Sequence, residues 1–414
     1  MKLTKFALLS VVFLDIMSQG LVIPILNTII MSPAQDFLPK GTSTAVRQFD
    51  FGLTMAVFFI AWFFGAAYIS KISDYIGRKA AMLICLVGAL LAYILTIIAL
   101  DTNSLTLLII ARILSGFTAG NQPIAQAALV DLSENEDQKI RFMGLVLLAV
   151  SIGMVAGPLI SGLMSDPAVF GKFASAALPF YLVAGMVVAG TLLIIFYYRD
   201  PPVERPPFTF KPLEIFVTMW HMVDRPLVLR LAPVFFFAQL TLSGFYVFMD
   251  TYFFSRFQFD TLQNAFTMVV LGLSMGTVSA FLVGPISARF NRLPILYTSL
   301  GLMTLSTGLS ILNPSPALAY VLIATFFVPF ALYYPTLLTL FSKAVDETEQ
   351  GWVMGVGVAL FTLGAGIISL IGGWLMSIDI HLPFIISVIS ALIAMGLIAL
   401  LWRGPEMKKL LERE

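Results

Sequence analysis

The chain alternates long apolar runs with short polar connections. Each run is close to the roughly 20 residues that an α-helix needs to cross a hydrocarbon core about 30 Å thick. Because backbone polar groups must be satisfied inside a bilayer, we interpret each run as a membrane helix. The pattern thus predicts an all-α membrane protein with twelve transmembrane helices, near residues 6–30, 51–70, 80–100, 105–130, 142–165, 174–198, 231–254, 264–286, 294–313, 317–342, 351–376 and 383–402.

A short polar sequence occurs twice, once in each half of the chain. SKISDYIGRK, from Ser70, has a diverged copy, GPISARFNRL, from Gly284. The fifth and eleventh runs are also similar, FMGLVLLAVSIGMVAGPLISGLM from Phe142 and VMGVGVALFTLGAGIISLIGGWL from Val353. Such an internal repeat is typical of membrane transporters that hold substrate between two related bundles.

The segment between the sixth and seventh runs differs from the rest of the chain. It contains several prolines, charges of both signs and a short amphipathic stretch, which suit a linker at the membrane surface. We therefore predict two pseudo-symmetric six-helix bundles at 1–198 and 231–403, joined by a cytoplasmic linker at 199–230. A cytoplasmic tail follows at 404–414.

The charged residues are few and unevenly placed. Hydrophobic residues make up 59% and charged residues 11% of 414 positions, whereas a soluble domain is about a quarter charged. Of the 24 Lys and Arg residues, all but Lys40, Arg47, Arg112, Lys172 and Arg256 lie at the termini or in the even-numbered connections. The positive-inside rule then predicts a multi-pass protein of the cell membrane, or of the inner membrane in a Gram-negative bacterium, with both termini cytoplasmic. A net charge of only +1 argues against a nucleic-acid partner.

Residues that build metal sites and enzyme active sites are scarce. Cys85 is the only cysteine, and the two histidines, His221 and His381, lie in connections. The sequence has no GxxxxGK[ST] phosphate-binding loop. We therefore expect neither an enzyme nor a metal or cofactor site, and transport would draw on the proton gradient.

Ionisable residues inside the apolar runs are the first functional candidates, because a bilayer makes each of them costly. Asp15 lies in the first run, Arg112 in the fourth and Asp250 near the end of the seventh. A carboxylate is neutral when desolvated and ionised when it faces water or a cation, so we interpret Asp15 as a proton carrier whose charge Arg112 biases. The alternative for Asp15 is a purely structural role as a hydrogen-bonding group. The alternative for Arg112 is that it braces the first helix by binding its backbone carbonyls. Asp250 either handles protons or forms a solvated rim with Arg256.

Polar side chains recur at helical spacing near these residues. We expect them to line a cavity that contacts a small-molecule substrate. They are Gln19 in the first run, Ser115, Gln122 and Gln126 in the fourth, Gln239, Ser243 and Tyr246 in the seventh, and Tyr333 and Tyr334 in the tenth.

Four motifs lie in order in the first half of the chain: LDIMSQGLVIPIL from Leu14, SDYIGRK from Ser73, RILSGFTAG from Arg112 and GMVAGPLISG from Gly153. With them the chain resembles a twelve-helix transporter of the major facilitator superfamily, and most closely the proton-coupled drug exporters that include the tetracycline efflux proteins. Each motif is weak alone, but their order, spacing and helix assignment all match the family.

The resemblance implies a role for the charged loop that ends the second run. In the family, this loop and an acid on the fourth helix form a network that latches the two bundles in the outward-facing state. The residues assigned to this latch are Asp74, Gly77, Arg78, Lys79 and Asp131. The alternative is plain topology, with loop cations obeying the positive-inside rule. In the second copy Ala288 replaces the Asp and Asn291 the Gly, so we expect that half to lack an acidic latch.

The resemblance also ties a pattern in the fifth run to antiport. Its residues are Gly153, Gly157, Pro158 and Gly162. Close packing of small residues against a neighbouring helix is the alternative interpretation.

The favoured function is proton-coupled export of a small lipophilic organic molecule or drug by alternating access, by a protein that we expect to be monomeric. The alternative is a dedicated exporter or importer of an anionic metabolite, such as a siderophore or another polycarboxylate, held by Arg112 and the glutamines. Runs 80–100, 264–286 and 294–313 lack the extra acids and the histidine of the tetracycline exporters, which argues against tetracycline itself.

Overall fold

The computed structural model describes residues 2–133, 135–200, 219–346 and 349–412. In these ranges the secondary structure is entirely helical, and eleven helices are long and apolar enough to cross a membrane. The protein is therefore a multi-pass, all-α membrane protein, as predicted. Its residues gather into two compact units: unit 1 comprises 1–211 and 259–269, and unit 2 comprises 212–258 and 270–414.

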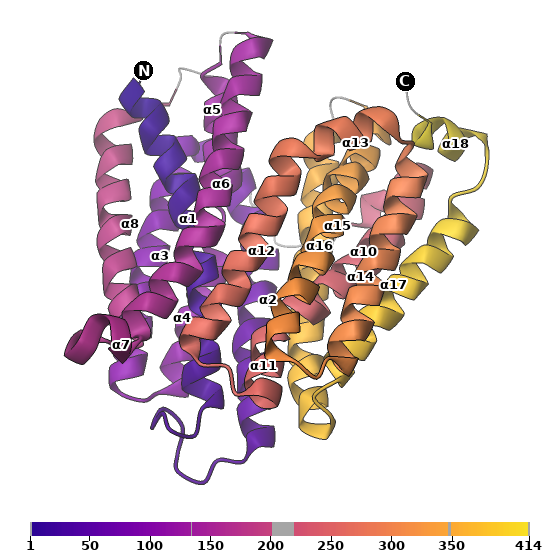
Figure 1. Ribbon diagram of the computed structural model, residues 1–414. Helices are drawn as coiled ribbons and strands as arrows, with labels where there is room; N and C mark the ends of the chain where they lie inside the picture. The colour runs from indigo at the N-terminus through magenta and orange to yellow at the C-terminus, as the bar shows by residue number, and fades with distance from the viewer. Residues whose placement is uncertain (1, 134, 201–218, 347–348, 413–414) are drawn as a thin grey trace. The chain divides into compact units, whose positions relative to one another are not determined.

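In unit 1, helix α1 packs most extensively against α6, and α4 packs against α2 and α3. Figure 1 follows these helices from indigo to magenta along the chain. Their bounds are α1 (Lys2–Met31), α2 (Thr44–Ile76), α3 (Arg78–Asp101), α4 (Leu105–Phe117), α5 (Asn121–Asp131), α6 (Glu136–Ser165), α7 (Pro167–Phe170), η1 (Gly171–Phe173) and α8 (Leu178–Tyr197).

In unit 2, α10 packs against α16 and α17, and α14 packs against α15. The first residues of α12 belong to unit 1 and the remainder to unit 2. The helices are η2 (His221–Asp224), α10 (Pro226–Tyr246), α11 (Met249–Phe257), α12 (Thr261–Phe281), α13 (Val283–Arg289), α14 (Arg292–Leu312), α15 (Pro316–Lys343), α16 (Gln350–Ile378), α17 (Leu382–Leu401) and α18 (Pro405–Leu411).

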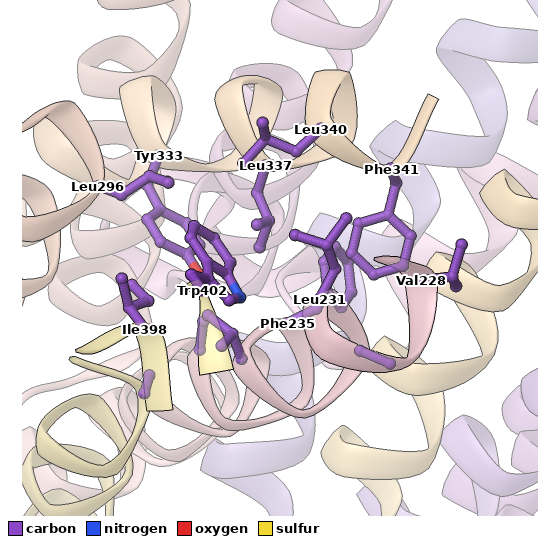
Figure 2. Close-up of a cluster of buried hydrophobic side chains, with 14 of the residues drawn as sticks. Val228, Leu231, Phe235, Leu296, Tyr333, Leu337, Leu340, Phe341, Ile398 and Trp402 are labelled. Atoms are coloured by element: carbon purple, nitrogen blue, oxygen red, sulfur yellow. The ribbon is translucent and has the colours of Figure 1, made fainter. Parts of the chain in front are cut away.

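Unit 2 has an apolar, aromatic-rich core. Figure 2 shows Tyr333 and Trp402 close together, with Phe235 and Phe341 beside Leu231. Residues 404–414, predicted as a tail, contain helix α18, whose Met407, Leu410 and Leu411 join this cluster. This end of the chain is therefore part of the packed unit.

Several predicted helices have different bounds in the structure. The run at 51–70 extends to Thr44–Ile76, and the run at 264–286 is divided into α12 and α13. The run at 105–130 was expected to form one helix, but it is interrupted at 118–120, between α4 and α5. The seventh begins at Pro226, inside the predicted linker, and is interrupted at 247–248, between α10 and α11. A proline at the first helical position is favourable because it has no N–H to leave unsatisfied. Of the predicted linker, residues 201–218 lie outside the described residues.

Candidate functional site

The carboxylate of Asp15 caps a helix that belongs to another part of unit 1. Asp15 lies midway along α1, and the backbone N–H of Gln122 donates a hydrogen bond to its Oδ2 over 3.1 Å. Gln122 is in the first turn of α5, where backbone N–H groups have no partner within the helix. The N-terminus of a helix carries partial positive charge, so it favours an ionised carboxylate.

The local sequence explains why α5 needs a cap from outside. Gly120 precedes its first residue and has no side chain that could accept a hydrogen bond. Pro123, the third residue of α5, has no backbone N–H. Asp15 therefore does for α5 what an Asp or Asn at the N-cap position does in an ordinary helix.

A small cavity lies beside this contact. It has a volume of about 30 Å³, and Asp15, Gln19, Arg112 and Ser115 are among its lining residues. The rest of the lining is Ser18, Val22, Leu26, Phe58, Ala89, Ala92, Tyr93, Thr96, Leu108, Thr118, Ala119 and Phe180. One water molecule needs at least about 10–15 Å³ by this kind of measure, whereas pockets for drug-sized ligands occupy about 300–1,000 Å³. The cavity therefore suits water and protons, and a drug does not fit in it.

Arg112 is buried on α4 and shares this cavity with Asp15. Its guanidinium carbon lies 4.0 Å from the centre of the Phe58 ring on α2, a cation–π contact. The structure thus brings together the acid and the cation that the sequence placed on separate helices.

The glycine pattern of α6 holds α1 in position. A Cβ atom on Gly157 would lie 2.1 Å from the carbonyl oxygen of Met17, and one on Gly153 would lie 3.0 Å from that of Phe13. The distance at Gly157 is too short for any side chain and the one at Gly153 is tight, so these glycines let the two backbones approach closely. Pro158, inside α6, in turn contacts α1 at Gly20.

The fourth residue of the pattern, Gly162, packs differently. A Cβ atom there would lie 2.5 Å from the Cβ atom of Ala265. All four residues of the pattern are thus close-packed, and the role in antiport that the resemblance implies stays a prediction.

The predicted latch residues lie where α2, α3 and α5 end or begin. Arg78 Nε lies 3.5 Å from Oδ2 of Asp131, the last residue of α5, and its Nη1 donates to Ser73 Oγ over 2.6 Å. Gly77 joins α2 to α3 with a φ of 100°, in the region that favours glycine. The side chain of Asp74 lies outside the described residues. The action of these groups as a latch between bundles stays a prediction.

Two further members of this charged cluster, Asp200 and Tyr198, were not predicted from the sequence. The backbone N–H of Lys79 donates to Asp200 Oδ1 over 2.9 Å, and its ammonium donates to the carbonyl oxygen of Ile195 over 2.7 Å. Burial, with the Asp200 carboxylate as the next cause, raises the pKa of the Tyr198 phenol above its usual range. Asp200 and Tyr198 directly follow α8, so only folding brings them to this loop.

In unit 2, two predicted cavity residues carry polar atoms without a partner. Gln239 and Ser243 lie one turn apart on α10, and both are buried. Neither the Gln239 amide nor the Ser243 hydroxyl has a hydrogen-bond partner among the described residues. Burying such groups unpaired costs about 1–3 kcal/mol each, so these positions favour a polar ligand or water.

The other predicted residues are placed as follows. Tyr333 lies in the apolar cluster of unit 2, and Tyr334 is packed against that cluster. Gln126 and Tyr246 are partly exposed on α5 and α10.

Asp250 is completely buried in the first turn of α11, so it does not face solvent in this structure. Arg256 instead donates to the Tyr252 hydroxyl over 2.6 Å and to the carbonyl oxygen of Ile311 over 2.7 Å.

Comparison with known proteins gives a consistent result. The family model described as Major Facilitator Superfamily matches residues 8–359 and 276–414. The chain is 25% identical over 360 residues to the class C tetracycline resistance protein of Escherichia coli, across 86% of this chain and 85% of that protein. It is 24% identical over 405 residues to multidrug resistance protein 1 of Bacillus subtilis, across 97% of each. Its fold matches a crystal structure of a D-xylose–proton symporter with a TM-score of 0.72 at 15% identity, over 98% of this chain and 99% of that one.

Proposed function

The chain belongs to the major facilitator superfamily of transporters, and from this premise we propose that it exports a small lipophilic organic molecule or drug in exchange for protons. Drug export is supported by the similarity to tetracycline and multidrug resistance proteins. We further propose that both termini face the cytoplasm, because that orientation satisfies the positive-inside rule.

The observation that carries proton coupling is the contact between Asp15 and the first turn of α5. An ionised carboxylate makes a charge-assisted hydrogen bond to the Gln122 N–H, roughly twice as strong as a neutral one. Protonation of Asp15 removes the charge and weakens its hold on α5. The position of α5 therefore depends on whether Asp15 carries a proton.

Helix α5 connects this acid to the charged loop. Gln122 and Asp131 are nine residues apart, about 14 Å at 1.5 Å per residue. One end of α5 is bound by Asp15 and the other by Arg78. In our proposal, protonation of Asp15 releases the first end, and the resulting shift of α5 weakens the ion pair at the second.

The substrate binds elsewhere. The cavity at Asp15 has room for about 30 Å³, so a drug is not held there. The unpaired side chains of Gln239 and Ser243 are the polar contacts that we assign to substrate in unit 2.

Two substitutions of Asp15 separate its chemistry from its structural role. Asparagine keeps an oxygen that can cap α5 but cannot carry the proton, whereas alanine removes both functions. In liposomes that contain a pH-sensitive dye, we expect Asp15→Asn to abolish proton flux driven by a lipophilic cation, with downhill substrate exchange retained. Asp15→Ala should also lower thermal stability.

Asp36 provides a matched control, because it is an exposed acid outside the helices. Asp36→Asn should leave proton flux unchanged. If Asp15→Asn pumps protons as the wild type does, the carboxylate is only a structural cap and the proposal fails.

An anionic metabolite is the second candidate substrate, because Arg112 is a buried cation. Binding at Arg112 would require a transport state in which the cavity at Asp15 is wider than the 30 Å³ of this structure. In the same liposomes, proton flux that appears only with polycarboxylates and disappears in Arg112→Gln would favour this candidate. Flux with lipophilic cations would favour drug export.

A further inference from the structure

A second, larger hollow lies on the outside of unit 1, between α1, α6 and α8. It has a volume of about 460 Å³, and its lining side chains are apolar except for Ser10. The Ser10 hydroxyl donates to the carbonyl oxygen of Phe6 over 2.8 Å, so its hydrogen is used within α1. The hollow exists because Ala149, Ala189 and Gly190 are small. We call it the outer groove.

The walls of the outer groove are exposed, although they are apolar. Phe6 is 59% exposed, Leu148 55% and Ile152 51%. All three lie in membrane-spanning segments, where an exposed apolar surface faces acyl chains. The groove therefore opens to lipid, and its occupant comes from the bilayer.

The length of the outer groove matches one leaflet. Along α1 its lining runs from Phe6 to Leu14, eight residues or about 12 Å. Half of a hydrocarbon core is about 15 Å. The hydroxyl of Thr4 on α1 donates to the carbonyl oxygen of Tyr197 on α8 over 3.0 Å, so these helix ends lie at one membrane surface. The groove thus runs from that surface towards the middle of the bilayer.

Positive charge marks the surface end of the outer groove. Lys5 directly precedes Phe6, and its Nζ lies 4.2 Å from the centre of the Phe142 ring on α6. Arg141, next to Phe142, is exposed. Basic residues at this level of a membrane attract anionic lipid headgroups.

From the groove, its length and these cations, we infer that the outer groove binds an acyl chain of an anionic phospholipid, with the lipid phosphate held at Lys5 and Arg141. The site is separate from the cavity at Asp15 and does not depend on the proposed transport cycle. Asp15 follows Leu14 directly, so the lipid lies against the helix that carries the proposed proton site.

Native mass spectrometry of the full chain tests this inference. The delipidated protein in detergent is mixed with phosphatidylglycerol or with phosphatidylcholine that has identical acyl chains. We expect one phosphatidylglycerol to be retained in preference to phosphatidylcholine. Lys5→Gln should reduce that preference about fivefold, the effect of one Lys beside a charged lipid surface. Equal retention of the two lipids by the wild type would overturn the inference.

A pair of tryptophan substitutions on α6 locates the bound lipid. Ala149→Trp fills the outer groove and should abolish retention of the lipid. Leu147→Trp is the control, because Leu147 is exposed on the same helix but does not line the groove. If Ala149→Trp is not monodisperse, Ala189→Phe fills the groove from α8. Undiminished retention in the filled variant would show that the lipid binds elsewhere and would refute the site.

Discussion

The two copies of the repeated loop have different structures. In the first copy, Gly77 has a φ of 100°, and Arg78 contacts Ser73 and Asp131. In the second, Asn291 occupies the glycine position with a φ of −66°. The arginine that follows, Arg292, donates to the carbonyl oxygens of Leu410 and Glu412 over 2.5 and 2.9 Å.

We propose that the two copies of the repeated sequence have different roles. In the first copy the arginine bridges two elements of unit 1 through a carboxylate, an interaction that a shift of α5 can break. In the second it binds carbonyls at the end of α18, where a cation stabilises the helix terminus. The first loop is thus suited to switching and the second to holding the end of the chain.

The largest expected effect is a difference in transport activity between variants of Arg78 and of Arg292. Arg78→Gln removes the ion pair to Asp131 and should lower transport about tenfold or more, the size of a typical coupling energy between sites. Arg292→Gln should leave transport nearly unchanged. Uptake of a fluorescent substrate into liposomes measures both variants. Equal losses in the two would mean that the loops do not differ in function.

The next effect concerns the backbone of the first loop. Alanine at Gly77 must adopt a positive φ, which costs about 1–3 kcal/mol of folding free energy. Asn291→Ala needs no such conformation and should cost little. Denaturation in detergent micelles compares the two variants. If Gly77→Ala left the folding free energy unchanged, the loop would have relaxed to another conformation.

A smaller effect is expected where Arg292 holds α18. Arg292→Gln replaces charge-assisted hydrogen bonds, which should cost about 1 kcal/mol and expose α18 to protease. Arg289, exposed at the end of α13, is the control. Limited proteolysis followed by mass spectrometry should show faster cleavage near Gly404 in Arg292→Gln alone.

The smallest effect is a dependence of stability on pH. In unit 2, Arg225 and Glu349 form an ion pair that is not part of the second copy of the repeated loop. The hydrogen bond from Arg225 lowers the pKa of Glu349 below its usual value. The pair therefore stabilises the fold above the usual glutamate pKa, and this contribution is lost as pH falls through the lowered value. Thermal unfolding is measured between pH 7 and pH 3, a range that brackets the usual glutamate pKa of about 4.3. Over this range the unfolding temperature of Glu349→Gln should fall less steeply than that of the wild type.

Much of the fold follows from local sequence. A membrane helix is specified by its own apolar residues, so the helices were predicted to within a few residues at most positions. Asp15 and Arg112 were identified for the same reason, since an ionisable residue inside an apolar run is visible without a structure. The run at 105–130 was misjudged because its apolar pattern continues across the break at 118–120.

The sequence by itself determined a multi-pass membrane transporter and its family, and it singled out Asp15 as the candidate proton carrier, which stays a prediction. Only the tertiary structure decided what that acid binds, because its partner is the backbone N–H of Gln122, which no pattern of side chains reveals. The outer groove is likewise invisible in the sequence. It arises where small residues from three helices meet, and such a coincidence depends on how the helices pack.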